Sequence, residues 1–99
     1  MNTGLGSGTL YANTTGSYNE AIGVNALIAN TTGSRNIAIG TTAMDAITTA
    51  DEAVAVGQDA LTSMTSNGFN VAVGRSSLAN VTTGQQNVGV GWKAGVSGN

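Results

Sequence analysis

Side chains able to perform acid–base chemistry are few in this sequence. Histidine and cysteine are absent, and the carboxylates are Glu20, Asp45, Asp51, Glu52 and Asp59. General acid–base catalysis at neutral pH relies mostly on histidine or on paired carboxylates in a tuned environment, and a serine or threonine nucleophile needs an adjacent base. We therefore predict no catalytic residue, no cofactor and no enzymatic activity.

The carboxylates Asp51 and Glu52 are adjacent, and Asp45 lies in the same part of the sequence. A calcium site is conceivable here, because Ca²⁺ takes roughly six to eight oxygen ligands. Neither an EF-hand loop nor a Gly-Gly-x-Gly-x-Asp repeat accompanies these residues. We interpret them as a solvated outer turn and predict no metal site.

Composition narrows the class of protein further. The chain of 99 residues has 15 glycines, no proline and 8% charged residues, against about 25% in an ordinary soluble domain. The net charge of −2 gives no basic surface for nucleic acid. No run of apolar residues approaches the roughly 18 needed for a membrane span, so we expect no membrane insertion.

The dominant feature is an internal repeat of 17 residues, which decides architecture before any local pattern does. Residues 1–99 form a single array of five full repeats (2–18, 19–35, 36–52, 53–69 and 70–86) and a partial one (87–99). Counting positions from Asn2, position 5 is always glycine: Gly6, Gly23, Gly40, Gly57, Gly74 and Gly91. Position 1 is asparagine in most repeats, including Asn19, Asn36, Asn70 and Asn87. We predict that these two columns shape the corners and form ladders between repeats.

Positions 2 to 4 have the chemistry of a short strand. Positions 2 and 4 are mostly β-branched aliphatics and position 3 is alanine or glycine, so one face carries bulk and the other carries a methyl group at most. We predict a second short strand at positions 8–11. The expected core combines positions 4 and 9: Ile22, Ile39, Val56, Val73, Val90, Leu10, Leu27, Met44, Leu61 and Leu78.

Positions 13 to 15 are expected to return the chain. The last of them is Gly16, Gly33, Ala50, Asn67 and Gly84 in successive repeats. Glycine and asparagine tolerate a left-handed turn and alanine does so poorly, so the third repeat is expected to turn differently. Stacked in register, such repeats make an all-β, parallel β-solenoid or β-roll, with asparagine amides and threonine hydroxyls stacked in ladders.

The core of such a solenoid is thin, with about three aliphatics in each repeat. A small chain without disulfides or metals often needs oligomerisation to fold stably. If the bulky strand face and the position 9 column do not both point inward, one of them forms an apolar stripe, which marks an interface. We therefore predict a homo-oligomer, and a trimer is the form expected. The end repeats show no polar cap, as in a segment of a longer fibre.

The segments NEAIGVNAL (19–27), NIAIGTTAM (36–44) and NVAVGRSSL (70–78), with NTTGS at 13–17 and 30–34, carry a family resemblance. They resemble the repeats of bacteriophage tail-fibre proteins and related bacterial surface fibres. More distantly, they are similar to the head repeats of trimeric autotransporter adhesins. The resemblance implies a rigid trimeric β-roll shaft or head, extracellular or on a virion, that presents a host-binding surface.

Recognition residues are best sought in the variable columns, which hold all four aromatics: Tyr11, Tyr18, Phe69 and Trp92. Aromatics are enriched at binding surfaces, so a cell-surface glycan or receptor is the expected partner. The competing interpretation is that they cover gaps between subunits or shield turns. Alternative functions are an ice-binding solenoid, suggested by the threonine columns, and a self-assembling extracellular filament joined through open strand edges. Adjacent threonines point to opposite faces of an extended chain, which argues against ice binding.

Overall fold

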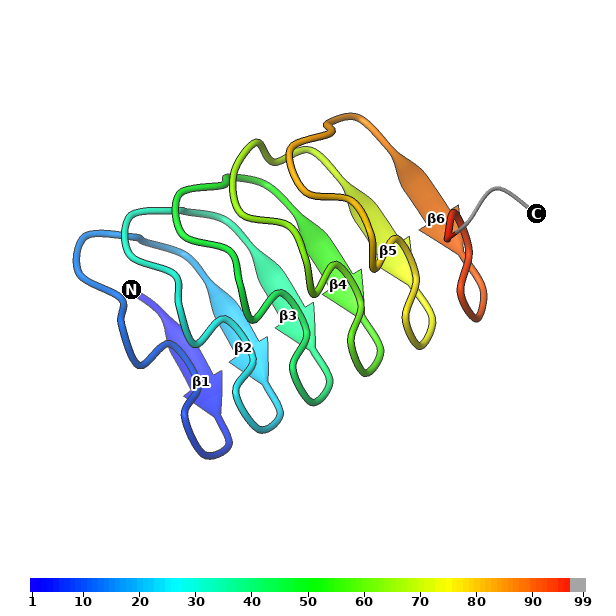
Figure 1. Ribbon diagram of the computed structural model, residues 1–99. Coiled ribbons are helices and arrows are strands. Elements are labelled where there is room, and N and C mark those ends of the chain that lie inside the picture. Colours follow the sequence, from blue (N-terminus) through cyan, green and yellow to red (C-terminus); the bar gives the residue numbers. More distant parts are fainter. Residues whose placement is uncertain (97–99) are drawn as a thin grey trace.

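The computed structural model describes residues 1–96 as a rod of stacked coils, one coil for each repeat (Figure 1). Coils 1 to 5 are residues 2–18, 19–35, 36–52, 53–69 and 70–86, and the sixth, partial coil begins at Asn87. Each coil contributes one strand of three residues: β1 (Thr3–Leu5), β2 (Glu20–Ile22), β3 (Ile37–Ile39), β4 (Val54–Val56), β5 (Val71–Val73) and β6 (Val88–Val90). The rod measures 38 × 22 × 15 Å.

The strands form one parallel sheet in the order β1-β2-β3-β4-β5-β6 (Figure 1). Each residue pairs with its equivalent in the next repeat, as Ala38 does with Ala55. A fixed period therefore becomes a fixed register, with neighbouring coils about 4.8 Å apart. This confirms the predicted all-β, parallel β-solenoid of 17-residue repeats.

The small face of each strand points into the coil. Ala21, Ala38, Ala55 and Ala72 are fully buried and meet the position 9 side chains Leu27, Met44, Leu61 and Leu78 inside the rod. Leu10, at the open end, is partly buried against the same core. Position 12 adds Ile47 and Met64 to the core, which the sequence analysis did not predict.

The predicted core was wrong for position 4. Ile22, Ile39, Val73 and Val90 are exposed and Val56 is half-buried, so none of these five belongs to the core. Period-two alternation places positions 2 and 4 on the same face, opposite to position 3. With the alanines packed against the position 9 column, the bulky face is turned to the outside.

The second predicted strand is also wrong. Residues 24–29 and their equivalents form consecutive turns, in which Ala26 N–H donates to Gly23 O (3.2 Å) and Ile28 N–H donates to Asn25 O (3.3 Å). The backbone of Asn25 and Leu27 is left-handed, with φ of 61° and 52°. A strand alternates side chains between two faces, whereas this path turns the position 9 side chain inward in each of coils 1 to 5. Burial of that side chain offsets the roughly 1–2 kcal/mol that a left-handed non-glycine residue costs.

The glycine at position 5 makes the corner at the end of each strand. Gly40 has φ of 134°, and a Cβ there would lie 2.6 Å from the backbone of Gly57. Both the dihedral angle and the stacking distance therefore require glycine.

The glycine at position 15 has a different role from the predicted one. Gly33 is not left-handed, but a Cβ there would lie 2.2 Å from Ala50 O in the next coil. Close stacking, and not a special φ, excludes a side chain. The third coil keeps the same bends as the second, contrary to expectation, and the departure falls in the fourth coil, where Asn67 has φ of 64°.

The buried asparagine column links each coil to the one before it. Asn36 N–H donates to Asn19 Oδ1 (3.0 Å), and Asn36 Nδ2 donates to Ala50 O (2.7 Å) and so fixes the turn of its own coil. Amide-on-amide stacking at this position is seen only between Asn87 and Asn70 within residues 1–96. Threonine hydroxyls likewise donate to backbone, as Thr31 Oγ1 does to Thr48 O (3.0 Å), and not to one another.

Candidate recognition surface

The outer side of the sheet is a continuous apolar surface, which we call the aliphatic face. It consists of the exposed or half-buried side chains of positions 2 and 4 in β2 to β6: Ile22, Ile37, Ile39, Val54, Val56, Val71, Val73, Val88 and Val90. Ile39 and Val73, near the middle of the rod, are each 37% exposed. Glu20 is the single charged residue in the strands, at one end of the sheet. This is the apolar stripe that the sequence allowed for.

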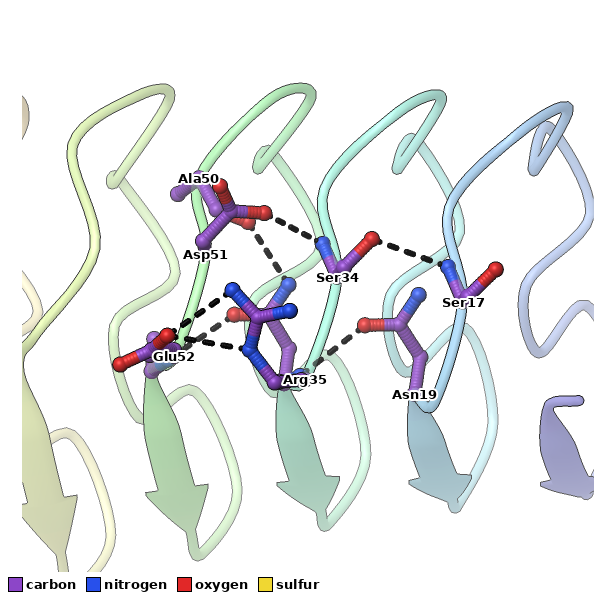
Figure 2. A network of polar contacts seen from close by, with 9 residues as sticks. Ser17, Asn19, Ser34, Arg35, Ala50, Asp51 and Glu52 are labelled. Atoms are coloured by element: carbon purple, nitrogen blue, oxygen red, sulfur yellow. Dashed lines mark hydrogen bonds and ion pairs between the residues drawn. The ribbon is translucent and has the colours of Figure 1, made fainter.

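A polar network along the turns joins coils 1, 2 and 3 (Figure 2). Ser34 Oγ accepts from Ser17 N–H (3.0 Å), and Asp51 Oδ1 accepts from Ser34 N–H (2.6 Å). Each position 16 side chain in this stretch thus caps the backbone of the preceding coil. The ladder ends at the next coil, because position 16 there is Gly68, which has no side chain.

The carboxylates of the predicted acidic turn are bonded across coils. Glu52 pairs with Arg35 (2.9 Å, Arg35 Nη2 to Glu52 Oε1), and Asp45 accepts from Thr62 Oγ1 (2.6 Å). Asp51 is directed to Ser34, away from Asp45 (Figure 2). No set of three or more carboxylates in residues 1–96 is placed to hold a metal ion.

A small hollow lies beside the irregular turn of coil 4. It has a volume of about 210 Å³ and is lined by residues 49–51 of coil 3, residues 66–69 of coil 4 and Gln85 of coil 5. Gly68 packs so closely on coil 3 that a Cβ would lie 1.3 Å from Asp51 O. The hollow is thus a product of the turn's altered path.

Two substitutions release this turn from the pattern of its neighbours. Ala53 occupies the position where Asn19 and Asn36 hold the turns of their own coils through a side-chain amide. Ala50 carries a Cβ that faces the next coil, where regular stacking leaves no room above Gly33. The turn of coil 4 is therefore neither held from below nor free to stack in the regular way.

The four aromatic side chains are exposed but do not cluster. Tyr18 and Phe69 share position 17 and lie three coils apart, on the order of 14 Å at the spacing of stacked strands. Tyr11 is at position 10, and Trp92 at position 6 stacks under Lys93 Nζ, 4.9 Å from the ring centroid. Phe69 is the one that lines the hollow.

Both threonines of the repeated pairs are on the surface, since the chain bends there and is not extended. Thr48 and Thr49 are exposed, as are Thr14 and Thr15. The argument that the pair must point to opposite faces therefore does not apply. The first hydroxyl of the pair is occupied, because Thr48 Oγ1 donates to Thr65 O (3.1 Å).

The sequence analysis did not find the hollow. The available signal was the loss of several repeat features within one stretch: Ala50, Ala53, Asn67 and Gly68 all depart from their columns. Read one column at a time, each departure looks like ordinary variation.

The fold and surface define a β-solenoid built from sequence repeats. Comparisons of the chain with protein-family models, with curated proteins and with solved structures found no match. No helix in residues 1–96 could span a membrane.

Proposed function

We propose that this chain is a non-enzymatic structural segment of an extracellular or virion-surface fibre, in which three copies pack in parallel along their aliphatic faces. The observation that carries the proposal is the aliphatic face, an unbroken row of isoleucine and valine over β2 to β6. A contiguous exposed apolar surface of this kind marks a protein interface. Because the face runs along the rod, copies joined through it form a thicker and stiffer rod.

The interior of the single chain supports self-association. Nine of the fifteen buried hydrophobic residues are alanine, so each coil buries little apolar area by itself. Burial of apolar surface contributes about 25 cal/mol per Å². Covering the valines and isoleucines outside the coil therefore adds a second core that the isolated chain lacks.

The ends of the rod support a place within a longer assembly. β1 and β6 each pair with one neighbour in the sheet, which leaves a row of backbone groups open at either end. Such edges pair readily with another strand. A preceding or following coil of the same fibre satisfies them, and so does another copy joined end to end as a filament.

The first test is the mass in solution by light scattering at two protein concentrations. The proposal expects one species of about 29 kDa, three times the chain mass of 9.7 kDa. A stable monomer would contradict self-association, and a mass of two chains would contradict the trimer. A mass that rises with concentration would favour the filament joined through the open edges.

Charge placed on the aliphatic face tests which surface is used. The double variant Ile39→Glu/Val73→Glu buries two carboxylates in the proposed interface and is expected to dissociate the trimer. The matched control is Thr32→Glu/Thr83→Glu, which adds the same charge at exposed turn positions. Dissociation of both variants, or of neither, would place the interface elsewhere.

Ice binding is a second candidate, favoured by the exposed threonine pairs. A flat ice plane requires a regular array, and the departure of coil 4 at residues 65–68 interrupts this one. Thermal hysteresis measured on the chain separates the two functions. A clear freezing-point gap that Thr32→Lys abolishes would replace the fibre proposal.

A further inference from the structure

We propose that the hollow beside Phe69 binds one neutral saccharide residue. The inference rests on the proposed function in one respect, that the fibre presents a recognition surface. It specifies the place and the class of ligand: the altered turn of coil 4, and a pyranose ring with free hydroxyl groups. No residue of the strands lines the hollow, so the site does not overlap the aliphatic face.

The hollow exposes a backbone donor that the neighbouring coils keep occupied. In coils 1 and 2 the N–H at position 16 donates to a side-chain oxygen from the coil above, Ser34 Oγ or Asp51 Oδ1. The equivalent donor in coil 3 is Asp51 N–H, and Gly68 above it offers no side chain. Within residues 1–96 Asp51 N–H has no hydrogen-bond acceptor. A hydroxyl oxygen of a ligand can take the vacant acceptor position.

Thr49 N–H is left in the same condition. In coils 1 and 2 the position 14 N–H donates to a threonine carbonyl one coil above, as Thr32 N–H does to Thr48 O (3.2 Å). No acceptor in the described part of the chain meets Thr49 N–H. Two backbone donors from one segment therefore face the turn whose altered path forms the hollow, in a spacing fixed by the backbone.

Phe69 supplies a rigid apolar platform. Its N–H donates to Asp51 O (3.1 Å), the same contact that Arg35 and Glu52 make with coils 1 and 2, so its backbone remains in the regular ladder. The side chain is 52% exposed, which leaves much of the ring open to solvent. An aromatic ring with one uncovered face suits the C–H face of a sugar, while amides around it suit the hydroxyls.

The remaining polar groups favour a neutral ligand. Asn67 Nδ2 donates to Thr83 O (3.0 Å), which orients that amide, and Gln85 is exposed at the rim. The nearest cation on these turns, Arg35, is engaged by Glu52. With no positive charge lining the hollow, a carboxylate or phosphate would be desolvated without a partner.

The size of the hollow limits the ligand to one sugar unit. Pockets for drug-sized molecules are about 300–1,000 Å³, and this one is about 210 Å³. One stacking contact and a few hydrogen bonds give weak binding at each site, with a dissociation constant on the order of 1 mM. Copies of the site on one trimer would raise the avidity for a surface carrying many sugars.

The experiment is an NMR titration of the isotope-labelled chain with glucose, galactose, mannose and N-acetylglucosamine, and with glucuronate and sialic acid as anionic arms. The expected result is a saturable shift of the amide signals of Asp51, Gly68 and Phe69 with at least one neutral sugar. Shifts confined to other residues, or no shift with any sugar up to about 50 times the expected dissociation constant, would overturn the proposal. Tighter binding of an anionic sugar would overturn the neutral class.

Two variants locate the site. Phe69→Ala is expected to weaken binding about tenfold, and Tyr18→Ala, at the same position of a regular coil, is expected to leave it unchanged. Equal effects of the two would overturn the assignment. The second variant, Ala50→Gly/Ala53→Asn/Asn67→Gly/Gly68→Ser, restores the repeat residues of coil 2 and should close the hollow and abolish binding. Retained binding in this regularised chain would also overturn it.

The mass measurement keeps this proposal separate from the fibre. Sugar binding by a monomer would contradict the trimer alone, and a trimer without sugar binding would contradict the site alone.

Discussion

The turns of coils 2 and 4 occupy the same place in the repeat but are held differently. In coil 2, Gly33 O accepts from Asn30 Nδ2 (3.0 Å) and from Asn19 Nδ2 (2.8 Å). In coil 4, Met64 replaces the first donor and Ala53 the second, and Asn67 O is reached by a longer bond of 3.4 Å from Asn70. The strands β4 and β5 nevertheless stay paired in register beside this turn.

This difference indicates that the sheet and the turns are stabilised separately. Register is kept by backbone pairing and by the alanine and leucine columns, which coil 4 retains in Ala55 and Leu61. The path of the turn depends on buried side-chain amides, which coil 4 lacks. A solenoid of this kind can therefore vary one turn into a binding hollow without disturbing the rod.

The largest expected effect comes from giving coil 3 the defect of coil 4. Asn36→Ala leaves Ala50 O and Ala53 N–H without their buried side-chain partners. We expect the free energy of unfolding to fall by about 3 kcal/mol. Chemical unfolding at a fixed protein concentration measures the change.

The matched control is Asn2→Ala, which removes the same two bonds at the exposed end of the rod. Water can replace them there, so a loss of about 1 kcal/mol is expected. Equal losses at the two sites would show that burial of the amide is not what stabilises the turn.

A methyl group in the regular turn should have the next largest effect. In Gly33→Ala the Cβ would lie 2.2 Å from Ala50 O and 2.5 Å from Asn30 Oδ1. Forcing these atoms apart is expected to cost about 2 kcal/mol. Gly84→Ala is the control, because the nearest atom to its Cβ would be Asn87 Nδ2 at 3.0 Å. Thermal unfolding of both variants at one concentration should show a clear shift for the first and little for the second.

A double-mutant cycle tests the link between positions 12 and 15. The Cβ of alanine at position 15 crowds an asparagine at position 12, and the chain pairs Asn30 with Gly33 but Ile47 with Ala50. Ile47→Asn can also donate to Asn30 Oδ1, a buried acceptor with no partner in the described residues. We expect Ile47→Asn/Ala50→Gly to be about 1 kcal/mol more stable than the sum of the single changes. Simple additivity would show that the two columns vary independently.

The smallest effect is expected at the surface ion pair. Both Arg35 and Glu52 are more than one-third exposed, so their attraction is weakened by water. Glu52→Gln should cost no more than about 0.5 kcal/mol at low ionic strength. The difference from the unaltered chain should vanish near 1 M salt, where the screening length is about 3 Å. A loss that persists in salt would mean that Glu52 acts through hydrogen bonding.

Much of the fold could be predicted from the repeat. Equal spacing of glycine, leucine and asparagine requires equivalent residues to stack, which fixes parallel pairing and register. Position 9 was correctly placed inside. The orientation of the strand could not be predicted, because alternation says that Ile39 and Ile37 share a face but not which face points inward.

The left-handed residues were equally hidden. Leucine at position 9 gives no local sign of a positive φ, and its column fits a strand as well as a chain of turns. Only the need to direct that side chain into a narrow coil selects the turns. The hollow was missed because it depends on residues from different coils, Ala50 and Gly68 among them, that meet only after stacking.

By itself, then, the sequence determined that this chain stacks in coils of 17 residues with one glycine corner in each. That follows because a parallel ladder of identical positions satisfies backbone hydrogen bonds and packs like side chains together at every repeat. The tertiary structure decided which side chains face out and where the array is interrupted. Those outcomes depend on the space inside a closed coil and on contacts between neighbouring coils, which the order of residues along one repeat does not contain.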